Sequence, residues 1–310
     1  MSAKATRQVF GETIAKLGET HPEIVVLDAD LSKSTKSDIF AKKFPDRFFE
    51  MGIQEANMIG VAAGMANAGK LPFICSFSCF VTGRYDQIRL SVAYSNANVR
   101  IIGSHAGVGI GEDGFSQQGL EDIALMRALA NMVVIQPADE VECISAMEFL
   151  VDYKGPAFIR TTRQNLMAVH APDFKFQLGK SDTLREGTDV AIFATGGTVQ
   201  GAVLAHEALE ASGISARVVN VASLKPFDAE AVVKAARECK GGIVTVEDHQ
   251  IVGGLGSSVA EAMAEAGVGA KLHRVGIEGF GESGTPEELY SHFQLDAAGI
   301  EARVRKFLGK

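Results

Sequence analysis

The residues best suited to chemistry are one glutamate and two phenylalanines that follow it. Glu55 lies directly before an apolar, glycine-rich segment, residues 58–67, that we expect to be a helix. An acid there can simply stabilise the first turn, because the helix dipole favours negative charge at that end. Phe77 and Phe80 follow at a spacing that suits a wall for a flat ring. This favours a functional role for Glu55.

Polar side chains also follow several predicted strands. Asp28, Asp30, Ser32 and Ser34 come after the first strand, His105 and a glycine-rich acidic loop after the third, and Arg163 after the fifth. In open α/β sheets, ligands bind beyond the carboxyl ends of the strands. The chain therefore offers a histidine, an acidic loop and an arginine for one site.

The glycine-rich loop, residues 107–111, does not match a dinucleotide-binding motif. It lacks the full G-x-G-x-x-G pattern, and the acids that follow it, Glu112 and Asp113, would repel a diphosphate. We expect its glycines to let a substrate approach the backbone. The motifs of serine hydrolases and zinc enzymes are absent from the sequence.

Strand-like and helix-like segments alternate along the whole chain, which predicts mostly parallel sheets of the α/β class. An irregular segment with Pro172, residues 170–178, separates two series, so we predict domains at residues 1–175 and 176–310. The predicted strands are residues 24–27, 71–75, 99–103, 132–135, 157–160, 190–194, 216–221, 242–246 and 272–275. Further predicted helices are residues 5–17, 138–150, 198–211 and 229–236.

Composition excludes several classes of function. The net charge of −8 and the lack of a basic run argue against nucleic-acid binding. No apolar stretch approaches the ~18 residues of a membrane span, and the opening residues lack the apolar core of a signal peptide. The four cysteines lack metal-site spacing and indicate buried free thiols. We therefore expect a cytoplasmic protein that binds neither nucleic acid nor membrane.

These motifs, in this order, resemble the C-terminal two-thirds of a transketolase. The resemblance rests on the following segments: Ala-Thr-Arg at 5–7, Ala-Asp-Leu at 29–31, Gly-Ile-Gln-Glu at 52–55, Ser-Phe at 76–77, Phe-Val at 80–81, Ser-His at 104–105, Gly-Glu-Asp-Gly at 111–114 and Arg-Gln-Asn at 163–165. Residues 246–249 and 253–256 resemble the family's C-terminal domain. The resemblance implies two doubly wound domains, a thiamine-pyrimidine-binding domain with a mostly parallel sheet and a transketolase C-terminal domain.

The resemblance also implies a cofactor and a reaction. Thiamine diphosphate would bind with Glu55 on its aminopyrimidine, Phe77 and Phe80 around that ring, and Asp30 and Leu31 beside it. The catalytic residues would be Glu55, His105 and Asp113. A two-carbon ketol unit would pass from a ketose phosphate to an aldose. The substrate would be bound by residues of both charge signs: Arg7, Ser34, His105, Asp113, Gln117 and Arg163.

One family motif is missing. Related enzymes hold the diphosphate and its Mg²⁺ or Ca²⁺ with Gly-Asp-Gly and a later Asn, and this chain has no Gly-Asp-Gly. The resemblance then implies that an N-terminal transketolase subunit supplies this half-site, in an assembly that we expect to be α2β2. We expect no metal ligands in the present chain.

Two departures from the family pattern concern the substrate. Ala106 stands where an Asp is usual, and Gln117 stands where a His is usual. Two alternatives stay open: a β subunit of a 2-oxo-acid dehydrogenase, and a non-catalytic homologue. For His249, at a strand end of the second domain, we expect a structural or interfacial role.

Overall fold

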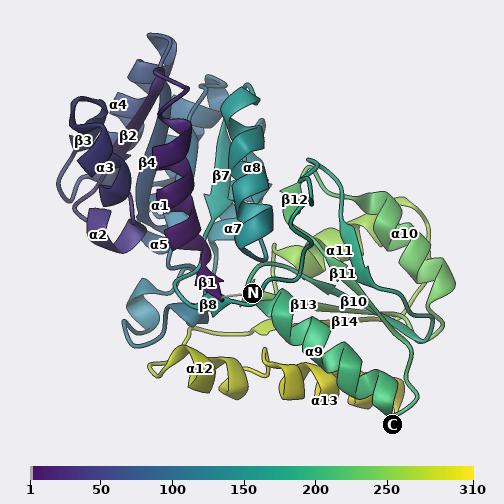
Figure 1. The fold of residues 1–310 in the computed structure, drawn as a ribbon. Helices are drawn as coiled ribbons and strands as arrows, with labels where there is room; N and C mark the ends of the chain where they lie inside the picture. The colour runs from purple at the N-terminus through teal and green to yellow at the C-terminus, as the bar shows by residue number, and fades with distance from the viewer. Residues whose placement is uncertain (1–2) are drawn as a thin grey trace.

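The computed structural model describes residues 3–310, whose strands form three sheets (Figure 1). The first sheet has the order β12-β6-β7-β5-β4-β2-β3, the second has the order β14-β13-β10-β11-β9, and β1 pairs with β8. The strands are β1 Lys4–Ala5, β2 Ile24–Asp28, β3 Phe48–Glu50, β4 Leu71–Phe77, β5 Arg100–Ser104, β6 Val133–Ile135, β7 Ala157–Arg160, β8 Asn165–Leu166, β9 Asp182–Arg185, β10 Val190–Ala194, β11 Ala216–Asn220, β12 Ser223–Lys225, β13 Ile243–Gln250 and β14 Leu272–Ile277.

Helices alternate with these strands. They are α1 Thr6–Leu17, α2 Ser32–Thr35, α3 Asp38–Lys43, α4 Glu55–Asn67, α5 Ser78–Thr82, α6 Tyr85–Gln87, α7 Asp122–Ala128, α8 Glu140–Asp152, α9 Thr198–Ala211, α10 Ala229–Glu238, α11 Leu255–Glu265, α12 Pro286–His292 and α13 Ala297–Leu308. A π-helical turn (Ile88–Tyr94) and three 3₁₀ turns (Pro45–Arg47, Val108–Ile110 and Phe115–Gln117) complete the described helical elements.

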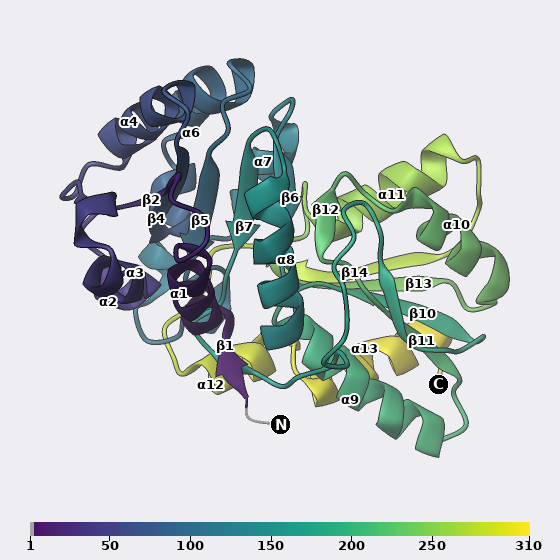
Figure 2. The same ribbon diagram turned by 45° about the horizontal axis from the view of Figure 1, so that its top comes forward.

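The first sheet is covered by helices on both faces. Apolar side chains of α1, α3 and α8 pack on one face, and those of α4, α7 and the π-helical turn pack on the other. Figures 1 and 2 show α1 and α8 side by side on their face. Burial on both faces explains why β2, β4 and β5 are buried at every position.

The second sheet is also doubly wound. Val190, Ile192 and Ala194 of β10 pack with α9 and α13, whereas Ala191 and Phe193 pack on the opposite face with α10 and α11. That second face shares one continuous apolar core with the α4 side of the first sheet. The two units therefore pack firmly against each other.

All nine predicted strands and all five predicted helices are present, with small shifts at their ends. The mostly parallel α/β architecture is confirmed, since among the strands of residues 3–310 only β12, β9 and the β1–β8 pair run antiparallel. The chain does not divide into two separate sheets at residue 176. β12, which follows residue 176 in sequence, pairs with β6 at the edge of the first sheet.

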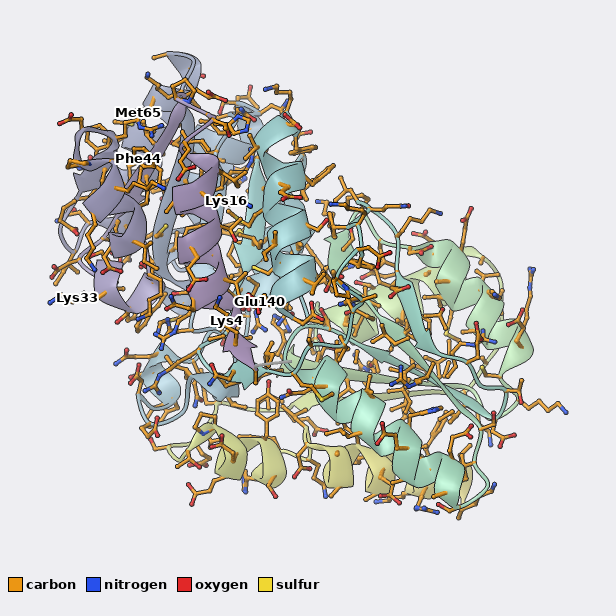
Figure 3. The ribbon with its side chains drawn as sticks, viewed as in Figure 1. Lys4, Lys16, Lys33, Phe44, Met65 and Glu140 are labelled. Carbon is orange, nitrogen blue, oxygen red and sulfur yellow. The ribbon has the colours of Figure 1, made fainter. Side chains whose placement is uncertain are left out.

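The irregular segment at 170–178 has no helix or strand and crosses α8. Ser145 Oγ of α8 accepts a hydrogen bond from the Phe176 backbone, at 2.9 Å. The buried His170 ring lies 3.0 Å from Asp139, the residue that caps α8. The start of α8 also contacts β1: Lys4 Nζ donates to Glu140 Oε1 at 3.1 Å (Figure 3). No helix within residues 3–310 has the length and apolar character to cross a bilayer.

Candidate active site

The predicted site residues meet at one edge of the first sheet. β2, β4, β5 and β7 are parallel neighbours, so their carboxyl ends lie side by side. Leu31 follows β2, Phe77 ends β4, His105 follows β5 and Arg163 follows β7. The fold therefore brings together residues that are more than 130 positions apart in sequence.

Glu55 begins α4, as expected, but its side chain is buried at 5% exposure. The Ser76 hydroxyl donates a hydrogen bond to Glu55 Oε1 at 3.2 Å. Within residues 3–310, Oε2 receives no hydrogen bond from another side chain or from the backbone. Oε2 keeps some exposure, so a ligand can reach it and donate a hydrogen bond to it. The residue is thus prepared to bind one polar atom.

Phe77 and Phe80 form the expected aromatic pair, and His105 extends it. The two phenyl rings stack with centroids 5.5 Å apart, and the imidazole of His105 stacks on Phe77 at 3.9 Å. Phe77 is 5% exposed, whereas Phe80 is only partly buried. Phe80 therefore offers the more accessible ring to a flat ligand.

His105 is held on both ring nitrogens. Arg7 Nη1 lies 2.8 Å from Nε2, and Ser104 Oγ lies 2.9 Å from Nδ1. Burial, and then the cations Arg7, Arg163 and Lys36, lower the pKa of His105 to about 3. The ring is therefore neutral at physiological pH.

Arg7 and Arg163 supply positive charge beside His105. Arg7 Nη1 also donates to the backbone carbonyl of Ser34 at 2.9 Å, so Ser34 contributes here through its main chain. Arg163 donates to Ile110 and, at 2.7 Å, to Glu112. Burial and the neighbouring Arg163 lower the pKa of Arg7, which marks two like charges held close together. Such a pair suits an anionic ligand.

The acidic loop holds the side chains of Asp113 and Gln117 in less fixed positions. Asp113 is exposed, and its charge opposes the lowering of the Arg7 pKa, so it faces the same cations. Gln117 is partly buried, and its backbone carbonyl accepts from the Cys79 thiol at 3.1 Å. Both side chains are free to turn toward a ligand.

The Asp30–Leu31 segment is shaped by Asp28, which the sequence analysis noted at the strand end but did not assign to the site. Asp30 is exposed, has φ 64°, and donates its backbone N–H to Glu50. The fully buried Asp28 carboxylate accepts from the Leu31 backbone and from the hydroxyls of Thr35 and Ser37, all at 2.7–2.8 Å. Burial raises the pKa of Asp28 to about 6. Its position at a strand end was the available signal.

The glycines of the 107–111 loop have a structural role that the sequence did not indicate, because they accommodate the second domain; their role toward a substrate stays a prediction. The buried Asp248 carboxylate accepts from the backbone of Val108 at 2.7 Å and of Gly109 at 3.1 Å. A Cβ on Gly107, which has φ 76°, would lie 2.2 Å from that carboxylate. The glycines are needed because the two domains meet there.

A buried polar network continues this contact, and the sequence prediction missed most of it. Arg160 donates to the Asp122 carboxylate at 2.7 Å and to the Asp248 carbonyl at 2.8 Å. Tyr290 donates to the Asp248 carboxylate at 3.0 Å. Since the partners are 38 to 88 residues apart, spacing alone gave no signal.

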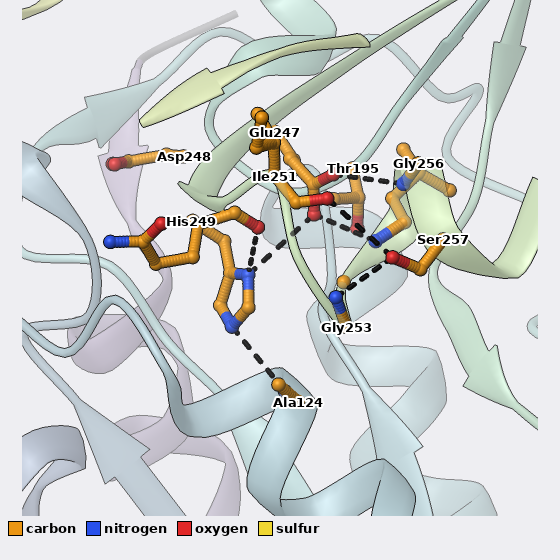
Figure 4. A network of polar contacts seen from close by, with 12 residues as sticks. Ala124, Thr195, Glu247, Asp248, His249, Ile251, Gly253, Gly256 and Ser257 are labelled. Atoms are coloured by element: carbon orange, nitrogen blue, oxygen red, sulfur yellow. Dashed lines mark hydrogen bonds and ion pairs between the residues drawn. The ribbon is translucent and has the colours of Figure 1, made fainter. Parts of the chain in front are cut away.

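His249 has the structural role that we expected. Its Nδ1–H donates to the Gln250 carbonyl at 2.7 Å, and its Nε2 accepts from the Ala124 backbone at 3.3 Å (Figure 4). Burial lowers the pKa of His249 to about 4. The neutral ring thus joins the second domain to α7 of the first.

The cysteines are all free, and three of the four are buried. Within residues 3–310, no group of three or more His, Cys, Asp or Glu residues could hold a metal ion.

Comparison with known proteins identifies the family. The model of the transketolase pyrimidine-binding domain matches residues 2–169, and that of the transketolase C-terminal domain matches residues 179–300. The chain is 45% identical to a putative transketolase C-terminal section of Methanocaldococcus jannaschii, over 99% of this chain and 97% of that protein. The chain belongs to the transketolase family.

Two further relatives match this chain over most of their own length. A 6-deoxy-6-sulfo-D-fructose transketolase subunit of Clostridium sp. (strain MSTE9) is 40% identical, over 95% of this chain and 91% of that protein. A structure described as a split gene transketolase, inactive β4 tetramer, is 43% identical with a TM-score of 0.89, over 99% of both chains. By contrast, this transketolase chain spans about half the length of human transketolase, to which it is 38% identical over 99% of its own length.

Proposed function

We propose that this chain is the pyrimidine-binding and C-terminal subunit of a split, thiamine-diphosphate-dependent transketolase. It takes part in transferring a two-carbon ketol unit from a ketose phosphate, or a related anionic ketose, to an aldose. The observation that carries the proposal is the pairing, at one sheet edge, of Glu55 with an open carboxylate oxygen and of Arg7 with His105 and Arg163. The first suits a polar ring atom and the second suits an anion.

The residues present fit the aminopyrimidine half of the cofactor. Glu55 would accept a hydrogen bond through Oε2, and Phe77 and Phe80 would contact the ring, with Asp30 and Leu31 beside it. Thiamine diphosphate supplies carbanion stabilisation when it is bound, and the protein orients it and adjusts its protonation. Glu55 would share a proton with a nitrogen of the aminopyrimidine ring, either donating it or accepting it.

A partner subunit completes this proposal. The sequence contains no Gly-Asp-Gly motif, so the diphosphate and its Mg²⁺ or Ca²⁺ would be held by an N-terminal subunit that carries that motif and a later Asn. The related β4 tetramer is described as inactive, which agrees with a site that needs a second kind of chain. We propose an α2β2 assembly, because closed two-fold symmetry suits paired sites.

The anionic end of the substrate would lie between Arg7, Arg163, His105 and the Ser34 backbone. Asp113 and Gln117 would accept or donate hydrogen bonds to the sugar hydroxyls, and His105 and Asp113 would act beside the reacting atoms. Ala106 and Gln117 depart from the usual pattern, and one relative is named for a sulfonated ketose. Phosphate and sulfonate ketoses are therefore both substrates to test.

Two smaller points belong to the same proposal. The domain division near residue 175 lies between the two matched regions, and the exact position stays a prediction. A cytoplasmic location agrees with the four free thiols.

Reconstitution tests the function. The purified chain, a partner with Gly-Asp-Gly, thiamine diphosphate and Mg²⁺ are mixed with fructose 6-phosphate and ribose 5-phosphate, and release of a four-carbon aldose phosphate is measured. We expect activity only in the complete mixture. Glu55→Gln should lower it at least ~100-fold, whereas Glu207→Gln, on the exposed side of α9, should not. Ketol transfer by this chain alone would contradict the proposal.

A further inference from the structure

A continuous chain of hydrogen bonds links Glu55 to Arg7 through two serines. Ser76 donates its hydroxyl to Glu55, and Ser76 accepts at its backbone carbonyl from the Ser104 hydroxyl, at 3.3 Å. Ser104 Oγ then contacts His105 Nδ1 at 2.9 Å. Both serines are fully buried, so water does not compete for these bonds. Ser104 is therefore the only protein group within residues 3–310 that contacts Nδ1.

The tautomer of His105 follows from its partners. A guanidinium can only donate, so Arg7 requires Nε2 to be an acceptor. In a neutral ring the proton must then be on Nδ1, which donates to Ser104 Oγ. Ser104 in turn donates to the Ser76 carbonyl. Every donor in this chain has an acceptor, so the arrangement is consistent.

An anion between Arg7 and Arg163 changes what His105 must do. Phosphate and sulfonate oxygens at the contact accept hydrogen bonds, so Nε2 can bind one only if it carries a proton. The ring cannot turn over easily, because Phe77 stacks on it at 3.9 Å and it is 2% exposed. The burial and cations that lower its pKa to about 3 also oppose a doubly protonated ring.

We propose that Ser104 is a positioning residue that lets His105 exchange its tautomer when the anionic end of a substrate binds. In the free protein Nδ1–H donates to Ser104. In the bound state Arg7 turns from Nε2 and donates to the anion, Nε2–H donates to the same anion, and the Ser104 hydroxyl turns from the Ser76 carbonyl to donate to Nδ1. Water that enters beside the anion takes one proton from Nδ1 and gives one to Nε2, so the net charge of the ring does not change.

A hydroxyl is the side chain that this exchange needs. Ser can both accept from Nδ1–H and donate to bare Nδ1, whereas an acid, an amine or an alkyl group cannot serve both states. The inference rests on the proposed function only in assigning an anionic substrate, because all of the residues involved lie in this chain. It can therefore be tested without the partner subunit.

The first experiment uses the full chain with ¹⁵N-labelled histidine. NMR reports which imidazole nitrogen carries the proton, and His105→Gln identifies the signals of His105 among the seven histidines. We expect a protonated Nδ1 without ligand, and a protonated Nε2 when inorganic phosphate or fructose 6-phosphate is added. A ring with both nitrogens protonated in the loaded state, or one that never changes, would overturn the proposal.

Variants at Ser104 separate positioning from simple loss of structure. Ser104→Ala should bind phosphate about tenfold more weakly, since bare Nδ1 would be buried without a donor. Ser104→Thr keeps the hydroxyl and should bind as the original chain does. Circular dichroism before and after heating verifies that each variant is folded. Equal phosphate affinity of folded Ser104→Ala and the original chain would refute the role of Ser104.

These outcomes are distinct from failure of the proposed function. If the reconstituted enzyme transfers no ketol unit while phosphate still moves the His105 proton, the proposed reaction is wrong and the tautomer exchange stands. If ketol transfer succeeds and the proton never moves, only the inference about Ser104 fails.

Discussion

At the scale of single residues, the proposed anion-binding side of the site depends on one arginine with two neighbours. Arg7 donates from the same Nη1 to the Ser34 carbonyl and to His105, and this fixes its plane. Lysine has the same charge but lacks the planar fork that gives parallel hydrogen bonds to an anion. The shape of the side chain matters here as much as its charge.

Arg7→Lys should therefore act mainly on substrate binding. We expect KM for fructose 6-phosphate to rise about tenfold or more in the reconstituted enzyme, as for loss of a charged hydrogen bond. The rate with unphosphorylated fructose as the donor should change little. Arg185→Lys, an exposed residue of β9, is the matched control. Equal losses with both sugars would show that Arg7 acts on something other than the anionic end.

Asp28 predicts a pH effect on stability. Burial raises the pKa of this carboxyl from 3.8 to about 6 in the folded chain. The folded state thus binds the proton more tightly than the unfolded state, and this contribution to the free energy of unfolding is lost as the pH rises from about 4 to about 6. The loss is about 3 kcal/mol at most, from 1.36 kcal/mol per pKa unit.

Asp28→Asn removes the charge and with it that pH dependence. Urea unfolding at pH 4 and pH 7 should show the variant gaining stability relative to the original chain as the pH rises. The Thr35 and Ser37 hydroxyls can turn to suit the amide, so the fold should persist. Parallel pH profiles for the two proteins would mean that Asp28 is ionised at little cost.

The sequence indicated the residues of the candidate site better than the buried residues that support them. Glu55, Phe77, His105 and Arg163 belong to short local motifs at strand ends, so their neighbourhood in the chain carries the signal. Asp122, Arg160 and Tyr290 find partners only after folding, and nothing in their local sequence distinguishes them from ordinary surface polar residues.

At the scale of elements, periodicity and apolar runs predicted the central strands, because burial on both faces makes each strand continuously apolar. The short edge strands β3, β9 and β12 were not predicted, because they lack such a continuous apolar run. None is buried at every position, and each forms by pairing with the free edge of a neighbouring strand. Such pairing is set by tertiary structure and leaves little trace in three or four residues.

Glycine positions in two elements should respond in opposite ways to alanine. Gly107 has φ 76° and faces the Asp248 carboxylate, so Gly107→Ala should lower the free energy of unfolding by about 2 kcal/mol or more. Gly64 lies inside α4 with open space around its Cβ position. Gly64→Ala should stabilise the chain by about 0.5–1 kcal/mol. Urea unfolding of both variants measures the difference, and a neutral Gly107→Ala would show that the loop can move away from the second domain.

At the scale of the whole molecule, the site edge of the first domain is held by the second domain. Asp248 accepts from the 107–111 loop, and Tyr290 of α12 donates to the same carboxylate. The acidic loop that carries Asp113 therefore depends on a domain that contributes no predicted ligand residue of its own. This gives the C-terminal domain a physical role in forming the site.

Tyr290→Phe tests that coupling with the loss of one oxygen atom. The Tyr290 hydroxyl donates to Asp248 of its own domain, and it accepts from Gln164 of the first domain at 2.8 Å. Their removal leaves a buried carboxylate and amide short of partners, so we expect a loss of about 1–3 kcal/mol in the free energy of unfolding. Tyr94→Phe, at a tyrosine that is 83% exposed, controls for the change in side chain. If the network couples the domains, Tyr290→Phe should also speed hydrogen exchange of the 107–111 amides, whereas Tyr94→Phe should not. An equal stability of the two variants, with unchanged exchange in the loop, would show that the shared apolar core alone holds the domains together.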